Sequence, residues 1–148
     1  MDKALPTGQW RKGVFEWPVR VYIEDVDAGG IVYHANHLKY AERARTELLA
    51  AGGLPHARLM QQGGMIVVGR LAIDYLKPLR LEEELLVKTR LLELGNDSAR
   101  LEQVIEKAGE VAARLEVGLV YLGSSGRPAR WPEAVKAALG HRQPGGPG

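Results

Sequence analysis

The residues most able to do chemistry lie in one stretch of the chain, residues 24–37. Within it the carboxylate of Asp27 is followed by the pair Gly29–Gly30, and a helical pattern begins at Asn36. Glycine adopts positive φ without steric cost and lets the backbone approach a ligand, so Gly30 is a candidate substrate contact. The first N–H groups of a helix lack intrahelical partners and carry the positive end of its dipole. A carboxylate facing such donors suits attack on a carbonyl whose oxygen becomes negative.

The same residues are compatible with other roles. Aspartate is common in turns, so Asp27 also fits an Asx turn, and Asp25 is expected to be a solvated or structural carboxylate. His34 and His37 could be taken for a metal site, but they lie three residues apart. A helical zinc pair usually spaces its histidines four apart with a glutamate between them. No fourth ligand follows at a recognisable spacing, so no metal is expected. The segment Gly123–Gly126 is not a G-x-S-x-G nucleophile elbow and is better explained as a turn.

Length and composition predict one soluble globular domain. The chain has 148 residues, of which 45% are hydrophobic and 26% charged, as is ordinary for such domains. A net charge of +2 without a basic run argues against nucleic-acid binding. Cysteine is absent, which excludes disulfides, thiolate metal sites and a cysteine nucleophile. The N-terminus lacks the apolar run of a signal peptide, and no stretch approaches the roughly 18 apolar residues of a membrane span. We therefore expect a cytoplasmic protein with no integral membrane segment.

The apolar pattern predicts a single α+β domain over residues 14–139. Alternation over residues 14–23 predicts a half-buried strand, with Pro18 at an edge or a bulge. Helical spacing of apolar residues predicts a long helix over residues 36–51, with Asn36 as its N-cap. The other predicted elements are a short helix over residues 56–62, strands over 65–76, 85–94, 99–106 and 111–122, and a short helix over 132–139.

This element order predicts an antiparallel β-sheet of about five strands wrapped around one long central α-helix, because long strands joined by tight turns pair antiparallel. The sheet's edge or open face is expected to be buried in a second copy of the chain, most simply in a symmetric homodimer. Residues 1–13 are expected to form a flexible arm and residues 140–148 a disordered tail. Tyr40 and Tyr75 are expected in the core.

The stretch around Asp27 resembles the hotdog-fold acyl-CoA thioesterases. The sequence is most similar to the branch that contains the 4-hydroxybenzoyl-CoA thioesterases and the Tol-Pal-associated acyl-CoA thioesterases. The matching residues are Tyr22–Leu38, Glu42–Arg45, Asp74–Pro78 and Gly126–Pro128. The resemblance implies a hotdog fold over about residues 14–135. It also implies hydrolysis of an acyl-CoA to the free acid and coenzyme A, with no cofactor.

The resemblance also assigns roles to individual residues. It places the catalytic aspartate at Asp27 and the oxyanion donor at the main-chain N–H of His34, with Tyr33 and the His34 side chain lining the thioester pocket. Arg127 is the first candidate for contact with the coenzyme A phosphates, and Arg130 the second. A basic residue that the benzoyl branch leads us to expect is missing from the Gly95-Asn96-Asp97 turn, and His34 and Ala35 also match the Tol-Pal-associated branch better. Other branches use a helical acidic residue as base; Glu42 holds such a position but is expected to pair with Arg45 or a partner subunit.

The route of hydrolysis stays open at this level. Hydrolysis of a thioester expels a thiolate, which is a good leaving group because its parent thiol has a pKa near 8.5. Asp27 could therefore attack the thioester directly to form a mixed anhydride, or deprotonate a water as general base. Two alternatives to a thioesterase are an acyl-CoA-binding scaffold without turnover and an enoyl-CoA hydratase of the same fold. The hydratase is disfavoured because its expected D-x-x-x-x-H pair is five residues apart, whereas Asp27 and His34 are seven apart. A homodimer or a dimer of dimers is expected.

Overall fold

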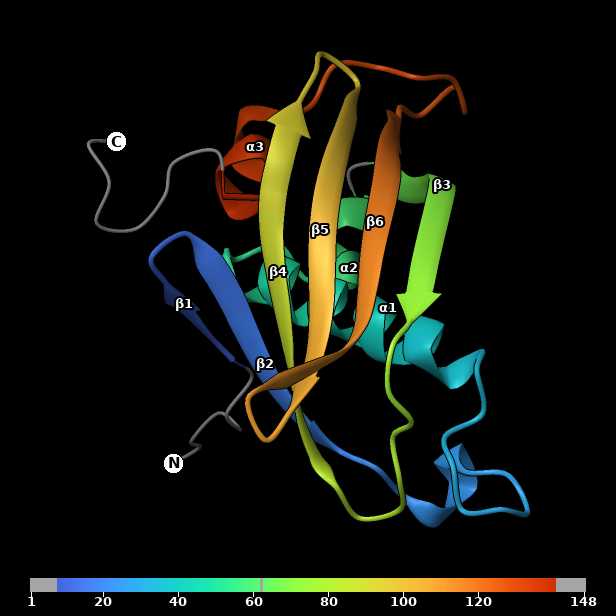
Figure 1. Ribbon diagram of the computed structural model, residues 1–148. Helices are drawn as coiled ribbons and strands as arrows, with labels where there is room; N and C mark the ends of the chain where they lie inside the picture. Colours follow the sequence, from blue (N-terminus) through green and yellow to red (C-terminus); the bar gives the residue numbers. More distant parts are fainter. Residues whose placement is uncertain (1–7, 62, 141–148) are drawn as a thin grey trace, which may run out of the picture.

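The long helix α1 (Asn36–Ala51) packs against one face of an antiparallel six-stranded sheet, as Figure 1 shows. The computed structural model describes residues 8–61 and 63–140. The sheet order is β1-β2-β4-β5-β6-β3. The strands are β1 (Gln9–Arg11), β2 (Val14–Arg20), β3 (Met65–Tyr75), β4 (Glu84–Leu94), β5 (Ser98–Lys107) and β6 (Glu110–Leu122). The remaining helices are η1, a 3-10 turn (Ile23–Asp25), α2 (His56–Gln61) and α3 (Glu133–Ala138). The predicted fold class is confirmed.

The core lies between α1 and the sheet. On the helix, Tyr40, Ala41 and Ala44 are fully buried, and the two alanines let the helix backbone approach the strands closely. Gln103 on β5 is also fully buried, yet its polar groups are satisfied. Its side chain donates to the carbonyl oxygen of Ala41 at 3.0 Å and to Thr89 at 2.9 Å. The opposite face of the sheet is charged, with exposed ion pairs such as Arg90–Glu102 and Arg100–Glu116.

Two features at the N-terminal end differ from the predictions. The flexible arm expected over residues 1–13 is wrong for residues 9–11, which form β1 and make the sheet one strand larger; residues 1–7 lie outside the described part. Lys12 and Gly13 have φ values of 52° and 80°, the conformation of a two-residue hairpin turn. The strand expected over residues 14–23 ends at Arg20, and residues 23–25 form η1 instead. Of the expected tail, residues 141–148 are not described.

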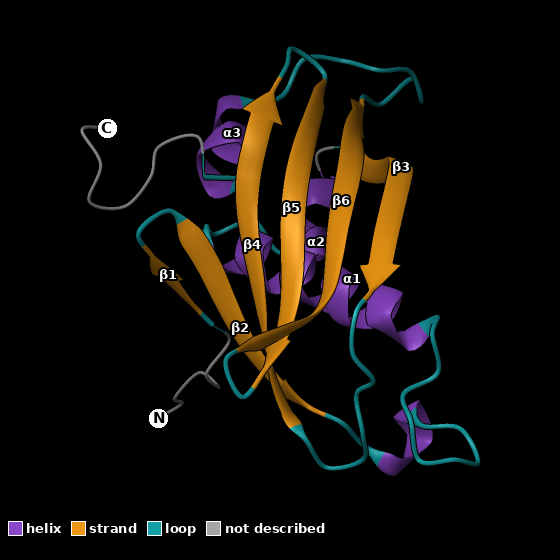
Figure 2. Cartoon of the chain, viewed as in Figure 1, coloured by secondary structure: helices purple, strands orange, loops and turns teal. Residues whose placement is uncertain are grey.

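Strand β3 is the outer strand at one end of the sheet, beside β6 (Figure 2). Apolar side chains along it and just after it are half exposed: Met65, Val68, Tyr75 and Leu76. Large exposed apolar groups beside an unpaired strand edge mark a surface suited to another chain. The other edge is less open, because β1 covers the first half of β2. Pro18 lies beyond the residues that β1 pairs, on the part of β2 that has a neighbouring strand on one side, as expected of a proline at a sheet edge.

Candidate active site

Asp27 begins a tight reversal of the chain in front of α1. Its main-chain N–H donates to the carbonyl oxygen of Ile31 at 2.9 Å, and the N–H of Gly30 donates to the carbonyl oxygen of Asp27 at 2.9 Å. Val26 and Val32 form an antiparallel bridge just behind this turn. Gly30 has a φ of 80°, a left-handed conformation that glycine adopts without strain. The reversal therefore depends on the glycine that the sequence supplies there.

The exposed Asp27 carboxylate has two oxygens in different surroundings. Oδ1 accepts hydrogen bonds from the N–H groups of Gly29 at 2.9 Å and Ile31 at 3.3 Å. Oδ2 has no hydrogen-bond partner within residues 8–61 and 63–140. The Asx-turn role and the catalytic role are thus compatible, because two amides orient the carboxylate through one oxygen and leave the other available to a reactant.

The main-chain N–H of His34 is the candidate oxyanion donor. Two nearby amides are engaged: the N–H of Tyr33 donates to the carbonyl oxygen of Asp25 at 3.0 Å, and that of Asn36 donates to the carbonyl oxygen of Tyr33 at 2.8 Å, whereas the N–H of Ala35 donates to no acceptor among the described residues. Within the described part of the chain, the His34 N–H donates to no acceptor. It lies just before α1, where the helix dipole favours negative charge. A free donor at this place suits the oxyanion of a tetrahedral intermediate.

A buried carboxylate, Asp25, ties the loop to α1. It is 3% exposed and accepts three hydrogen bonds: from Asn36 Nδ2 at 2.8 Å, from the Tyr40 hydroxyl at 2.9 Å and from the N–H of Tyr22 at 2.9 Å. Burial and this hydrogen bond raise the pKa of Tyr40. The structural role expected for Asp25 fits these contacts. The prediction of Asn36 as N-cap is wrong, because its side chain binds Asp25 and the N-cap is Ala35, without a side-chain cap bond.

Aromatic rings surround His34. The Tyr33 ring centroid lies 4.4 Å from that of His34, and the Tyr75 ring lies 6.4 Å from His34 and 4.8 Å from His37. The Tyr75 hydroxyl donates to the carbonyl oxygen of His34 at 2.8 Å, and Nδ1 of His37 lies 3.2 Å from the same oxygen. His34, His37 and Tyr75 border a hollow of about 320 Å³ beside the loop, whereas Tyr33 is not among the residues that line it. The main chain at His34 is therefore held from two sides while its ring stays exposed.

Tyr75 and His37 are candidate-site residues that sequence reasoning missed. Tyr75 was expected in the core, and this is wrong: it ends β3 over the start of α1 and is 46% exposed. The sequence feature that could have indicated a role for Tyr75 at the site was its place in Asp74–Pro78, one of the segments that resemble the thioesterases. His37 was weighed only as a metal ligand, whereas its ring is buried against Tyr75. Burial lowers the pKa of His37 below its usual 6.5, so the ring is neutral at pH 7.

Arg127 and Arg130 lie at the other end of the molecule from Asp27. Pro128 pairs with Leu122, which faces Met65 at the start of β3, whereas the Asp27 loop adjoins Tyr75 at the end of β3. Figure 1 shows the two loops at opposite ends of the strands. The eleven residues of β3 span about 35 Å at ~3.3 Å per residue. One protomer therefore does not bring these exposed arginines together with Asp27.

The ion pair expected between Glu42 and Arg45 is not among the contacts of the described residues. The Arg45 guanidinium instead donates to Gln103 Oε1 at 2.9 Å, and burial lowers the pKa of Arg45. Glu42 is exposed. In the same part of the chain, no three His, Cys, Asp or Glu side chains are grouped to hold a metal ion. Nor is any helix there long and apolar enough to cross a membrane.

Comparison with known proteins identifies the family. Residues 21–139 match the model of the thioesterase-like superfamily. The chain belongs to the thioesterase-like superfamily. It is 38% identical over 130 residues to the acyl-CoA thioesterase YbgC of Haemophilus influenzae, covering 86% of this chain and 95% of that protein. It is 40% identical over 95 residues to the acyl-CoA thioester hydrolase YbgC of Escherichia coli O6:H1, covering 64% of this chain and 71% of that one.

Solved structures of the superfamily share the architecture. A probable thioesterase from Bartonella henselae superposes with a TM-score of 0.77 at 28% identity, over 80% of this chain and 99% of that one. The hotdog fold and the resemblance to acyl-CoA thioesterases inferred from the residues around Asp27 are thus confirmed.

Proposed function

We propose that this chain is an acyl-CoA thioesterase that hydrolyses its substrate to a carboxylic acid and coenzyme A, with Asp27 as the reacting carboxylate. The observation that carries the proposal is the pairing of an oriented carboxylate with an unused main-chain donor in one loop: Asp27 Oδ2 and the His34 N–H. The likeness to YbgC proteins supports the thioester substrate.

Two routes use these groups equally well. In the first, Asp27 Oδ2 attacks the thioester carbon, the carbon–sulfur bond breaks, and water opens the resulting anhydride. In the second, Asp27 takes a proton from a water that attacks the same carbon. In both, the carbonyl oxygen becomes an oxyanion that the His34 N–H stabilises, and the thiolate leaves and takes up a proton. Transfer of ¹⁸O from labelled water into Asp27 in a single turnover identifies an anhydride that water opens at the aspartyl carbonyl.

The substitution Asp27→Asn tests the assignment. Asparagine keeps an Oδ1 that can accept from Gly29 and Ile31, so the turn is retained while the charge is lost. We expect hydrolysis, followed by thiol release from a panel of acyl-CoAs, to fall about 10²–10⁴-fold, the usual contribution of such a group. Acyl-CoA binding should stay near that of the wild type. Glu24→Gln, which removes an exposed charge from the same segment, is the matched control. Wild-type turnover in the asparagine variant refutes the assignment, and a wild type that binds but never hydrolyses indicates a scaffold.

A homodimer formed through β3 would complete the site. The half-exposed apolar residues of this outer strand support such pairing. If two copies of β3 pair antiparallel about a two-fold axis, the Met65 end of one strand meets the Tyr75 end of the other. The partner subunit's Arg127 would then approach Asp27, although Arg127 is remote from it within one protomer. Acyl-CoA phosphates would be bound between subunits, and the cytoplasm remains the predicted location.

Mixing two impaired variants tests this sharing. Arg127→Ala should raise KM, whereas Asp27→Asn should lower kcat. If the site is shared, a heterodimer of the two variants has one site with both residues intact, and mixing restores activity at low substrate concentration. Mixing after denaturation and refolding ensures subunit exchange. A mixture no more active than its components contradicts the shared site.

A further inference from the structure

The segment that closes the Asp27 turn rests against the loop between β3 and β4, residues 76–83. Three contacts join them: the Val32 N–H to the Leu79 carbonyl oxygen at 2.8 Å, the Leu81 N–H to the Gly30 carbonyl oxygen at 3.3 Å, and the Ile31–Arg80 bridge. The N–H of Ile31 also holds Oδ1 of Asp27. Ile31 thus contacts both the 76–83 loop and the Asp27 carboxylate, so a displacement of the loop should also displace the carboxylate.

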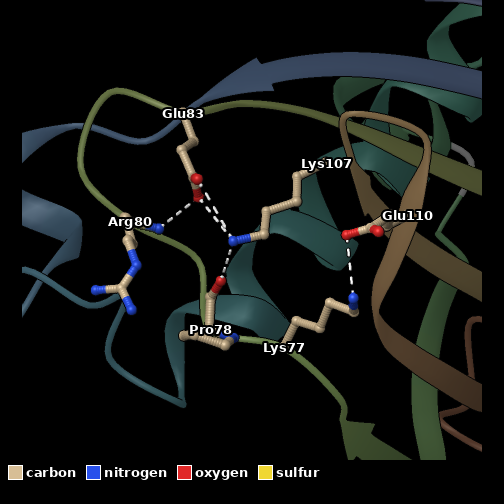
Figure 3. A network of polar contacts seen from close by, with 6 residues as sticks. All are labelled: Lys77, Pro78, Arg80, Glu83, Lys107 and Glu110. Carbon is tan, nitrogen blue, oxygen red and sulfur yellow. Dashed lines mark hydrogen bonds and ion pairs between the residues drawn. The ribbon is translucent and has the colours of Figure 1, made fainter.

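Lys107, at the end of β5, joins the two ends of this loop. Its ammonium donates to the carbonyl oxygen of Pro78 at 2.6 Å and lies 3.4 Å from Glu83 Oε2. Glu83 Oε1 also accepts from the N–H of Arg80 at 2.7 Å. Figure 3 shows the ammonium between the carbonyl and the carboxylate, with the loop curving around them. The Lys107 side chain is 18% exposed, so solvent screens this contact less than a surface pair.

Main-chain hydrogen bonds also hold both ends of the loop. Its last residues are fixed, because Glu82 and Glu83 each make a main-chain hydrogen bond with Val21 at 3.0 Å. Its first residues are tied to β6, because the N–H groups of Leu76 and Lys77 donate to the carbonyl oxygen of Ala112 at 2.8 and 3.0 Å, and the side chain of Leu79 is buried. Glu82 has a φ of 70°, a left-handed conformation that is unfavourable for a residue with a side chain. Lys107 thus connects the middle of the loop at Pro78 to its end at Glu83.

We propose that Lys107 is a positioning residue for the Asp27 site, acting through Glu83, the Pro78 carbonyl and the 76–83 loop on the segment that orients the carboxylate. Lys107 contacts neither Asp27 nor the hollow beside His34. Its role in turnover rests on the proposed function, but its role in holding the loop does not. The second ion pair in Figure 3, Lys77–Glu110, is exposed on both sides and contributes little by comparison.

The test compares Lys107→Met with Lys107→Arg and Lys88→Met. Lys88 forms a partly buried pair with Glu106 at 3.1 Å, on the same two strands but with no hydrogen bond or ion pair to residues 76–83 within the described part of the chain, so its loss controls for a missing lysine–glutamate pair. With a hydrolysed acyl-CoA, Lys107→Met should lower kcat about 10–100-fold and leave KM within about two-fold, because a misplaced reacting group costs turnover rather than binding. Lys107→Arg should restore most of kcat, and Lys88→Met should leave it unchanged.

Amide hydrogen exchange provides a readout that needs no activity. In Lys107→Met the N–H groups of Ile31 and Val32 should exchange at least about ten-fold faster than in wild type, whereas in Lys88→Met they should not. Unchanged exchange at both amides, or an equal loss of kcat in the Lys88 control, overturns the proposal. If Lys107→Met does not fold, Glu83→Gln decides by the same two readouts. A wild type that hydrolyses no acyl-CoA refutes the proposed function alone, since exchange still tests the positioning.

Discussion

Replacing Tyr40 with phenylalanine tests whether the buried Asp25 carboxylate fixes the Asp27 loop to α1. Tyr40 is fully buried and its hydroxyl is one of three donors to that carboxylate. Phenylalanine keeps the ring, so packing changes little and the cost arises from one lost hydrogen bond. Hydrogen bonds to charged groups are worth about 1.5–3 kcal/mol, and we expect the free energy of unfolding to fall by this amount.

The matched control is Tyr75→Phe. Its hydroxyl also donates to one oxygen, the carbonyl of His34, but the acceptor is neutral and the side chain is 46% exposed. A neutral hydrogen bond is worth about 0.5–1.5 kcal/mol, so this variant should lose less. Both substitutions remove the same atom, and the difference between them isolates burial and acceptor charge.

Urea unfolding at fixed protein concentration, followed by tryptophan fluorescence, measures both changes. With an m-value of about 2 kcal/mol/M, a loss of ~2 kcal/mol moves the midpoint by about 1 M. Concentration must be constant because dimer dissociation would otherwise contribute. A loss for Tyr40→Phe no larger than that for Tyr75→Phe refutes the reasoning, since the carboxylate would then not depend on its third donor.

Two further predictions concern the same loop. Burial lowers the pKa of His37 below 6.5, so the unfolded chain binds more protons than the folded chain just below pH 6.5. The free energy of unfolding should therefore decrease as the pH is lowered there, by up to about 1.4 kcal/mol per pH unit. His37→Gln should flatten that part of the unfolding profile; an unchanged slope contradicts the assignment. Gly30→Ala should cost about 1–2 kcal/mol, because φ is 80°. Gly29→Ala, where an added Cβ meets only Asp27 Oδ1 at 3.4 Å, should cost less in urea unfolding, and equal costs would contradict the role of φ.

The long elements were predictable because their apolar spacing is regular. Helix α1 covers the predicted residues 36–51, and it ends at the pair Gly52–Gly53, as expected. Strand β1 was missed because three residues carry too short an alternation to recognise, and because its turn places Lys12, which has a side chain, at positive φ. The N-cap at Asn36 failed for a different reason: a contact with Asp25, eleven residues away, outweighs the local preference.

The candidate site was predictable where it is local in sequence and not where it is assembled by the fold. Asp27 and His34 stand in one loop, so motif and chemistry point to both. Tyr75 joins the same site from the end of a distant strand, and its place in the alternation gave it the parity of a core residue. Because β3 is the outer strand of the sheet, the side chain of Tyr75 at its end contacts the segment just before α1 although its alternation predicts a core position.

The exposed position of Asp27 makes its orientation depend on residues that do not touch substrate. The turn buries little apolar surface, so its shape derives from main-chain pairing and from two polar anchors. Asp25 ties it to α1 on one side, and Lys107 ties the supporting loop to β5 on the other. The anchors share no residue, so either can fail while the other holds. Loss of activity without loss of binding should therefore arise from changes at both places, and a scan of substitutions confined to the loop would miss them.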